Sequence, residues 1–251
     1  MTERLDKILS HQGFGTRKDV KKLLRSGLVT LNGKTVYDSA AHVDLEKDTL
    51  CYDGETVNVQ GELYLMMNKA GDCVCSTKEG ERETVYDFID FELRQTHSGK
   101  KLHTMGRLDA DTTGLLLITS DGELTHRLIS PKNHVPKTYA VKLRDSTDEK
   151  QKLEYAQKLK EGIQVPREQN EEGFLSESAE LSWNTNEEGF DCELTVYEGK
   201  YHEVKRLFAA LGNEVTALKR VSFACLSLDK KLAPGEYREL TEEELERLFA
   251  V

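Results

Sequence analysis

One stretch of this sequence, residues 105–122 (MGRLDADTTGLLLITSDG), constrains the fold more than any other. Its centre, residues 115–118, is a short apolar run with turn residues on both sides, which is typical of a buried strand. Asp109 lies two residues after Arg107, on the segment just before this predicted strand. Because a buried strand moves little, the segment is predicted to hold one carboxylate in a fixed place, as a reactive side chain requires.

The remainder of the chain mixes predicted strands and helices without a regular βαβ rhythm. Ser120 or Asp121 is expected to cap the helix that follows the central strand. The pattern predicts an α+β fold with a mainly antiparallel, mixed sheet flanked by helices. The strand candidates are residues 63–67, 115–119, 138–143, 179–183, 190–197 and 214–219, and the helix candidates are residues 85–90, 124–129, 148–161, 201–211 and 242–249. Residues 167–189 are acidic and weakly patterned, and are expected to form a surface hairpin or loop.

The N-terminal region, residues 1–58, is predicted to be a small separate domain. Its apolar residues fall at helical spacing in two short segments, and Thr16 with Asp19 makes the capping-box pattern before the second. The Asn-Gly pair at 32–33 supplies the positive φ angles of a tight turn and so predicts a β-hairpin. Residues 59–251 then form a second, larger α+β domain.

The composition is that of a soluble protein. The chain has 251 residues, of which 37% are hydrophobic and 32% charged. It has no apolar run near the roughly 20 residues of a membrane span and no signal-peptide pattern at its start. The five cysteines are scattered and lack paired metal-ligand spacing. We therefore expect reduced thiols, a cytoplasmic location and no membrane partner.

Basic residues gather in two segments although the formal net charge is −10. Residues 1–36 carry eight of them against three acidic residues, and residues 124–144 contain no acid. An acidic protein with local basic patches suits contact with RNA at a defined place. Solvated faces without a binding role are the alternative. The candidate RNA-binding residues are Arg4, Lys7, Arg17, Lys18, Lys21, Lys22, Arg25, Lys34, Lys132 and Lys137.

Four segments carry a resemblance to a known family. The Gly-Arg-Leu-Asp start of residues 106–122, with its Gly-Leu-Leu-Leu run, resembles the catalytic motif of the pseudouridine synthases. Three further segments stand in the order of that family's other motifs: Asn68-Lys69-Ala70-Gly71, Lys137-Thr138-Tyr139 and Tyr201-His202-Glu203-Val204-Lys205-Arg206. The wording of the last, with Ala-Pro-Gly-Glu-Tyr-Arg at 233–238, is similar to the RsuA family, which modifies small-subunit rRNA. The N-terminal region resembles an S4 RNA-binding domain.

The resemblance implies that Asp109 is the catalytic carboxylate, ionised in a site shielded from water. Because burial alone would neutralise a carboxyl group, a cation must lie beside it. Lys205 matches the family's basic partner, and Arg206 is the second candidate. Asp111, two residues further along the same segment, is the rival for the catalytic role, and composition alone does not separate the two.

Other residues have roles implied by the same resemblance. Arg107 fills the gap that a flipped uridine leaves in the RNA stack. Tyr139 stacks on or abuts the flipped uracil, although a half-buried strand residue is the alternative. Lys69 shapes the floor of the site. His202, among four histidines near the motifs, lacks the spacing of a zinc site and is expected at the surface or against RNA.

The implied reaction is an isomerisation in ribosomal RNA, in which uracil is detached from its sugar, turned over and rejoined through carbon. It requires no metal and no cofactor. The expected substrate is 16S rRNA, at the equivalent of uridine 516, within a small-subunit assembly intermediate. The protein is expected to be a monomer. A synthase of 23S rRNA and a non-catalytic S4-type RNA-binding protein are the alternatives, with a metal-dependent nuclease as a remote third.

Overall fold

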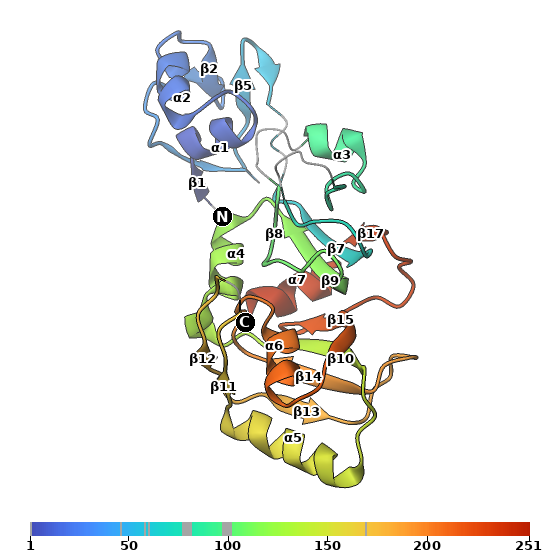
Figure 1. Ribbon diagram of the computed structural model, residues 1–251. Helices are drawn as coiled ribbons and strands as arrows, with labels where there is room; N and C mark the ends of the chain where they lie inside the picture. Colours follow the sequence, from blue (N-terminus) through green and yellow to red (C-terminus); the bar gives the residue numbers. More distant parts are fainter. Residues whose placement is uncertain are drawn as a thin grey trace. The chain divides into compact units, whose positions relative to one another are not determined.

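The chain folds into two units, which Figure 1 shows as a ribbon. The computed structural model describes residues 2–45, 47–57, 59, 61–76, 82–96, 102–168 and 170–251. The first unit is Met1–Leu63 with Ile89–His103, and the second is Tyr64–Phe88 with Thr104–Val251. The domain boundary expected after residue 58 stays a prediction. The two compact units differ from it mainly because residues 89–103 belong to the first unit. Residues 58 and 60 of that boundary region lie outside the described part.

Up to residue 58 the first unit contains two short helices and small antiparallel sheets, as the sequence predicts, and a third helix, α3, comes from residues 89–103. Its elements are β1 (Thr2–Arg4), α1 (Leu5–His11), α2 (Arg17–Leu24), β2 (Val29–Leu31), β3 (Lys34–Thr35), β4 (His42–Asp44), β5 (Leu50–Tyr52), β6 (Glu55–Thr56) and α3 (Phe91–Thr96). Thr16 and Asp19 form the predicted capping box of α2. Asn32 has a φ of 51° and Gly33 of 77°, which confirms the predicted tight turn between β2 and β3. Buried Leu5, Leu9 and Leu24 belong to the core of this unit.

The second unit is built on one mixed sheet with the strand order β13-β14-β10-β15-β9-β7-β17. Every pairing along this path is antiparallel except that of β15 with β9. The strands of the unit are β7 (Tyr64–Lys69), β8 (His103–Thr104), β9 (Thr113–Thr119), β10 (Lys137–Leu143), β11 (Gln164–Val165), β12 (Phe174–Leu175), β13 (Glu180–Ser182), β14 (Cys192–Val196), β15 (Val215–Phe223), β16 (Leu226–Ser227) and β17 (Tyr237–Glu239). Its helices are α4 (Gly122–Ile129), η1 (Pro131–Asn133), α5 (Glu149–Glu161), α6 (Glu203–Ala210) and α7 (Glu242–Phe249). The α+β prediction is confirmed.

Strand β9 is the predicted apolar run, and it lies inside the sheet between β7 and β15 (Figure 1). Its residues 114–119 are all buried. Asp121, rather than Ser120, caps α4, because its carboxylate accepts hydrogen bonds from the backbone N–H groups of Glu123 and Leu124. Its other carboxylate oxygen accepts a hydrogen bond from the Tyr64 hydroxyl at 2.9 Å. The segment with Asp109 therefore leads directly into the most buried strand of the unit.

One predicted helix, residues 85–90, is wrong. The structure has turns there, and helix α3 begins only at Phe91. The backbone N–H of Val85 donates to the carbonyl of Val74, and the carboxylate of Asp87 accepts from the N–H and the hydroxyl of Thr84. Thr84 instead forms an isolated parallel bridge with Val74, so the periodicity of residues 85–90 reflects burial of Val85 and Ile89 in a turn.

Candidate active site

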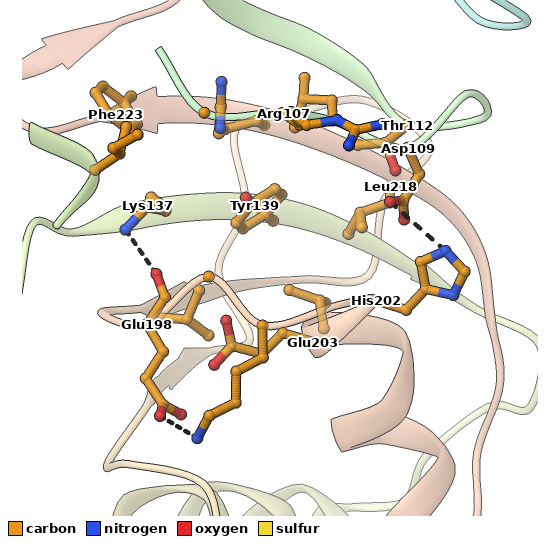
Figure 2. Close-up of a pocket in the computed structure, with 18 of the residues that line it drawn as sticks. Arg107, Asp109, Thr112, Lys137, Tyr139, Glu198, His202, Glu203, Leu218 and Phe223 are labelled. Atoms are coloured by element: carbon orange, nitrogen blue, oxygen red, sulfur yellow. Dashed lines mark hydrogen bonds and ion pairs between the residues drawn. The ribbon is translucent and has the colours of Figure 1, made fainter. Parts of the chain in front are cut away.

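A cavity of about 250 Å³ lies beside the segment that carries Asp109 (Figure 2). Three sets of residues far apart in the sequence line it: the segment between β8 and β9, strands β10 and β15, and the start of α6. Arg107 and Asp109 come from the first, Tyr139 and Arg220 from the second, and Glu203 from the third. Two of these five, Glu203 and Arg220, did not stand out in the sequence.

Asp109 lies beside two cationic or potentially cationic side chains of α6 and its preceding turn. Lys205 Nζ lies 3.1 Å from Asp109 Oδ2, and His202 Nε2 lies 3.7 Å from Asp109 Oδ1. The Asp109 side chain is 30% exposed, so without RNA the site is an open cleft rather than the dry one expected from the sequence. His202 faces the carboxylate instead of standing alone at the surface, and its ring stacks on Tyr201 with centroids 3.7 Å apart.

Lys205 also binds Asp111, the rival carboxylate. Its ammonium donates to both carboxylate oxygens of Asp111, at 2.7 and 3.0 Å. Burial works against both charges, but the contact outweighs it, lowering the pKa of Asp111 and raising the pKa of Lys205. Asp111 is 68% exposed and does not line the cavity, whereas Asp109 does. Geometry therefore separates two carboxylates that composition could not.

Lys69 holds the backbone of the segment that carries Asp109 in place. It is fully buried at the end of β7, and its ammonium donates to the carbonyls of Ala70, Ala110 and Thr112 at 2.9, 3.0 and 2.9 Å. Two of these carbonyls flank Asp111 within the segment, and the N–H of Thr112 donates to the carbonyl of Asp109. A buried cation shared among carbonyls holds the segment in one conformation.

Tyr139 forms the centre of the cavity wall and is 9% exposed. Figure 2 shows its ring between Lys137 and Asp109 along the cavity. Burial raises the pKa of its phenol, the Arg220 guanidinium opposes this, and the charges of Glu203 and Asp109 add to it. The pKa of the phenol thus depends on three ionisable groups that line the same cavity.

Glu203 is a buried carboxyl group that the sequence did not single out. It is 6% exposed, and burial, together with the charge of Glu198 and a hydrogen bond to it, raises its pKa to about 8. Glu198 keeps its own charge, because Lys200 and the N–H of Glu177 bind its carboxylate and hold its pKa low despite burial. Glu203 is therefore mostly neutral at pH 7. Its place between His202 and Lys205 in the third motif was the available signal.

Arg206 does not serve as the partner of Asp109. Its guanidinium is 5% exposed, donates to the carbonyls of Pro166 and Glu172 and lies over the Phe174 ring. Successive residues of a helix point about 100° apart, so Lys205 and Arg206 leave α6 in different directions, and Lys205 is the one that reaches Asp109. Arg206 instead fixes the hairpin of β11 and β12.

Lys137, one of the predicted RNA-binding residues, is buried in the cavity wall rather than exposed at a basic surface. It is 9% exposed, and its ammonium donates to the carbonyls of Val135 and Glu198 at 2.8 and 2.7 Å. Burial and the charge of Arg220 lower the pKa of Lys137 to about 8, while Glu203 opposes this. Lys137 therefore forms part of the cavity wall, because its strand β10 runs through the sheet interior.

The remaining candidate RNA-binding residues are at the surface or near it. Seven of them are exposed. They lie in α2 and just after it, in β3 and in η1: Arg17, Lys18, Lys21, Lys22, Arg25, Lys34 and Lys132. The Arg4 guanidinium donates two hydrogen bonds to the carboxylate of Asp6. Lys7 Nζ lies 2.6 Å from Glu3 Oε1. Arg107 is exposed at the rim of the cavity. An exposed guanidinium at the rim is free to contact RNA.

Two further features of the described residues bear on other classes of protein. In that part of the chain no group of three or more His, Cys, Asp or Glu side chains is placed to hold a metal ion. No helix formed by the described residues combines the length and the apolar character needed to span a membrane.

Comparisons with known proteins agree with this geometry. Residues 63–210 match the family model described as RNA pseudouridylate synthase, and residues 3–50 match the S4 domain. The Uncharacterized RNA pseudouridine synthase YtzG of Bacillus subtilis is 43% identical, over 98% of each chain. The ribosomal small subunit pseudouridine synthases A of Haemophilus influenzae and Vibrio vulnificus are 38% and 41% identical over 98% of this chain and 99% of theirs.

A solved structure points the same way. A crystal structure of a pseudouridylate synthase, 38% identical to this chain, has a TM-score of 0.64 and covers 98% of this chain and 99% of its own. Family model, full-length relatives and fold thus agree. The chain belongs to the RNA pseudouridine synthases, carries an S4 domain at its N-terminal end, and is an isomerase that converts uridine in RNA to pseudouridine.

Proposed function

We propose that this protein converts one uridine of small-subunit (16S) rRNA to pseudouridine, at the equivalent of uridine 516. The observation that carries the proposal is the 3.1 Å contact of Lys205 with Asp109 at a cavity that Tyr139 also lines. Full-length relatives named as small-subunit enzymes, 38% and 41% identical, support this choice of RNA over 23S rRNA.

In this proposal Asp109 is the catalytic carboxylate. The ammonium of Lys205 holds its carboxylate in place beside the bound nucleotide while the base displaces water from the open cleft. Tyr139 contacts the flipped uracil, and stacking of this kind contributes about 1–3 kcal/mol. Arg107, exposed at the rim, occupies the gap in the RNA stack.

The N-terminal unit supplies affinity for the rRNA. Exposed basic residues of α2 contact phosphates, which positions the RNA without reading its sequence. Lys18, Lys21 and Arg25 are three of them. We place the reaction in the cytoplasm, on a small-subunit assembly intermediate, with the protein as a monomer. None of the steps is assigned to a metal or a cofactor.

A modification map tests substrate, position and activity together. Pseudouridines in 16S and 23S rRNA are compared between the parent strain and a strain lacking this gene, complemented with the wild-type chain or with Asp109→Asn. We expect one 16S pseudouridine to vanish and to return only with the wild-type chain. Loss of a 23S pseudouridine instead would assign the protein to the large subunit. Unchanged maps, or restoration by Asp109→Asn, would contradict the proposal.

A further inference from the structure

Arg220 is a buried cation with an unused donor in the wall of the active cavity. The side chain is 1% exposed, and its Nη2 has no hydrogen-bond partner among the described residues. Its other contacts hold it firmly: Nε donates to the carbonyl of Leu115 at 2.7 Å, and the guanidinium lies 5.1 Å from the centre of the Phe223 ring. A buried donor without a partner is costly, and in a native protein it calls for an explanation.

A second orphan group lines the same cavity. The hydroxyl of Thr112 is also buried and lacks a hydrogen-bond partner within the described part of the chain. Two unsatisfied polar groups, Thr112 Oγ1 and Arg220 Nη2, thus belong to residues that line one cavity. A ligand with oxygen or nitrogen atoms at its rim would satisfy them, and the edge of a uracil base carries such atoms.

The position of Arg220 relative to Tyr139 indicates which part of a bound uracil Arg220 would contact. Strands β10 and β15 pair with Tyr139 opposite Arg220, and the guanidinium acts directly on the Tyr139 hydroxyl. A uracil that contacts the Tyr139 ring therefore has its rim within reach of Arg220. Lys137, on the same strand as Tyr139, also feels the charge of Arg220, so this wall of the cavity is electropositive.

The reaction creates the charge that such a wall would stabilise. When the bond between N1 of uracil and C1′ of ribose breaks, its electron pair stays on the base, which becomes an anion with charge on N1, O2 and O4, and the matching positive charge stays on the sugar, shared between C1′ and the ring oxygen. The base then turns, C5 supplies the electron pair of the new bond to C1′, and the C5 proton is transferred to N1, which carries a hydrogen in pseudouridine. The product has the atoms of the substrate, and the negative charge exists only between the two bonds.

We propose that Arg220 is a catalytic residue that donates from Nη2 to a carbonyl oxygen of the uracil and stabilises the detached base as an anion. Preorganised donors of this kind act strongly because they need no rearrangement in a site with little water. Their removal typically slows a reaction about 100- to 1,000-fold. The inference rests on pseudouridine formation at the cavity and does not depend on which rRNA is the substrate.

The test uses single-turnover conversion of a target RNA by the full-length chain. Arg220→Gln removes the charge and keeps a donor, and Arg220→Lys keeps the charge. We expect the Gln variant to be about 100- to 1,000-fold slower and the Lys variant to lie between it and the wild type. Arg206→Gln is the matched control, because it removes a buried arginine outside this cavity. Thermal unfolding of each variant reports on folding.

A second RNA, with 5-fluorouridine at the target, separates chemistry from structure. Fluorine stabilises a uracil anion, so consumption of 5-fluorouridine should suffer less from Arg220→Gln than conversion of uridine does. An equal loss on both RNAs, or a Gln variant as fast as the wild type, would overturn the role of Arg220. Failure of the wild-type chain to convert uridine at all would instead refute pseudouridine formation, so the two failures are distinguishable.

Discussion

Lys205 and Arg206 are neighbours on α6 with the same charge, yet the fold gives them unrelated tasks. Lys205 binds Asp109 and Asp111, while Arg206 donates hydrogen bonds to backbone carbonyls of the β11–β12 hairpin. The direction in which each side chain leaves the helix decides this. At the scale of single residues, the chemistry of the site therefore depends on orientation, and each residue can be tested by a minimal substitution.

Replacement of Asp109 by Asn should abolish turnover while RNA binding persists. The change removes the charge but preserves shape, and loss of proton transfer alone would slow the reaction about 100- to 10,000-fold. Asp111→Asn is the control, because its exposed contact with Lys205 contributes about 1 kcal/mol or less. Pseudouridine formation and RNA affinity are measured for both. A greater loss with Asp111→Asn than with Asp109→Asn would reverse the assignment.

Glu203 should make the folded protein less stable as pH rises. Its pKa is raised from 4.5 to about 8 by burial and by Glu198, so the folded state holds a proton that the unfolded state has released. The stabilisation is complete below about pH 4.5 and disappears as pH rises through about 8. Melting temperatures of the wild type and of Glu203→Gln, measured across this interval, provide the test. The Gln variant should show a flatter profile, and identical profiles would contradict the raised pKa.

At the scale of secondary-structure elements, β9 and β15 approach each other so closely that the sequence must have glycine at the contact. These strands form the parallel pairing of the sheet path, and it brings Gly114 opposite Arg220. Gly114 has a φ of 96°, and a Cβ at this position would lie 2.3 Å from the carbonyl oxygen of Arg220. Only glycine fits such a site without moving backbone. The segment with Asp109 and the strand with Arg220 are joined at this contact.

Substitution of Gly114 by Ala should destabilise the second unit by about 2–6 kcal/mol, combining backbone strain with steric displacement. Gly189→Ala is the control, since Gly189 has a φ of 85° but nothing within 4 Å of the added Cβ. It should lose only the strain contribution, about 1–3 kcal/mol. Chemical denaturation measures both. If the two variants unfold at the same denaturant concentration, the backbone clash is not what requires glycine at position 114.

Elements with local signals were predictable from the sequence, and those that depend on distant contacts were not. The capping box at Thr16, the Asn-Gly hairpin and the apolar strand β9 each rest on residues close in sequence. The helix predicted at residues 85–90 is wrong because its apolar spacing reflects burial of Val85 and Ile89 in a turn. The short strands β8, β16 and β17 were missed, since two- or three-residue strands carry too little pattern.

At the scale of the whole molecule, charge is divided unevenly along the chain. The formal net charge is −10, yet α2 and its flanks present exposed Arg17, Lys18, Lys21 and Arg25. A negative total discourages unspecific binding of nucleic acid, while the local basic surface still allows contact with phosphates. Affinity and chemistry are thus assigned to different units of the chain.

Replacement of Lys18, Lys21 and Arg25 by Ala should weaken RNA binding without changing conversion of bound RNA. If each side chain neutralises one phosphate, the slope of log affinity against log salt should fall by about 2. Lys150→Ala with Lys160→Ala, on the exposed side of α5, is the control. Filter binding at several salt concentrations gives the slopes. An unchanged slope in the triple variant would show that α2 does not carry the phosphate contacts.

The sequence by itself determined the strand β9, the tight turns, the capping box and, through its motifs, the family, and it singled out Asp109 as the candidate catalytic carboxylate. These features are encoded by residues near one another or by the order of short motifs. Only the tertiary structure decided that Lys205 rather than Arg206 meets Asp109, that Lys137 is buried, and that Glu203 and Arg220 complete the cavity. Those outcomes depend on how α6 packs and on the pairing of β10 with β15. Both are contacts between residues far apart in the sequence, so no local sequence pattern predicts them.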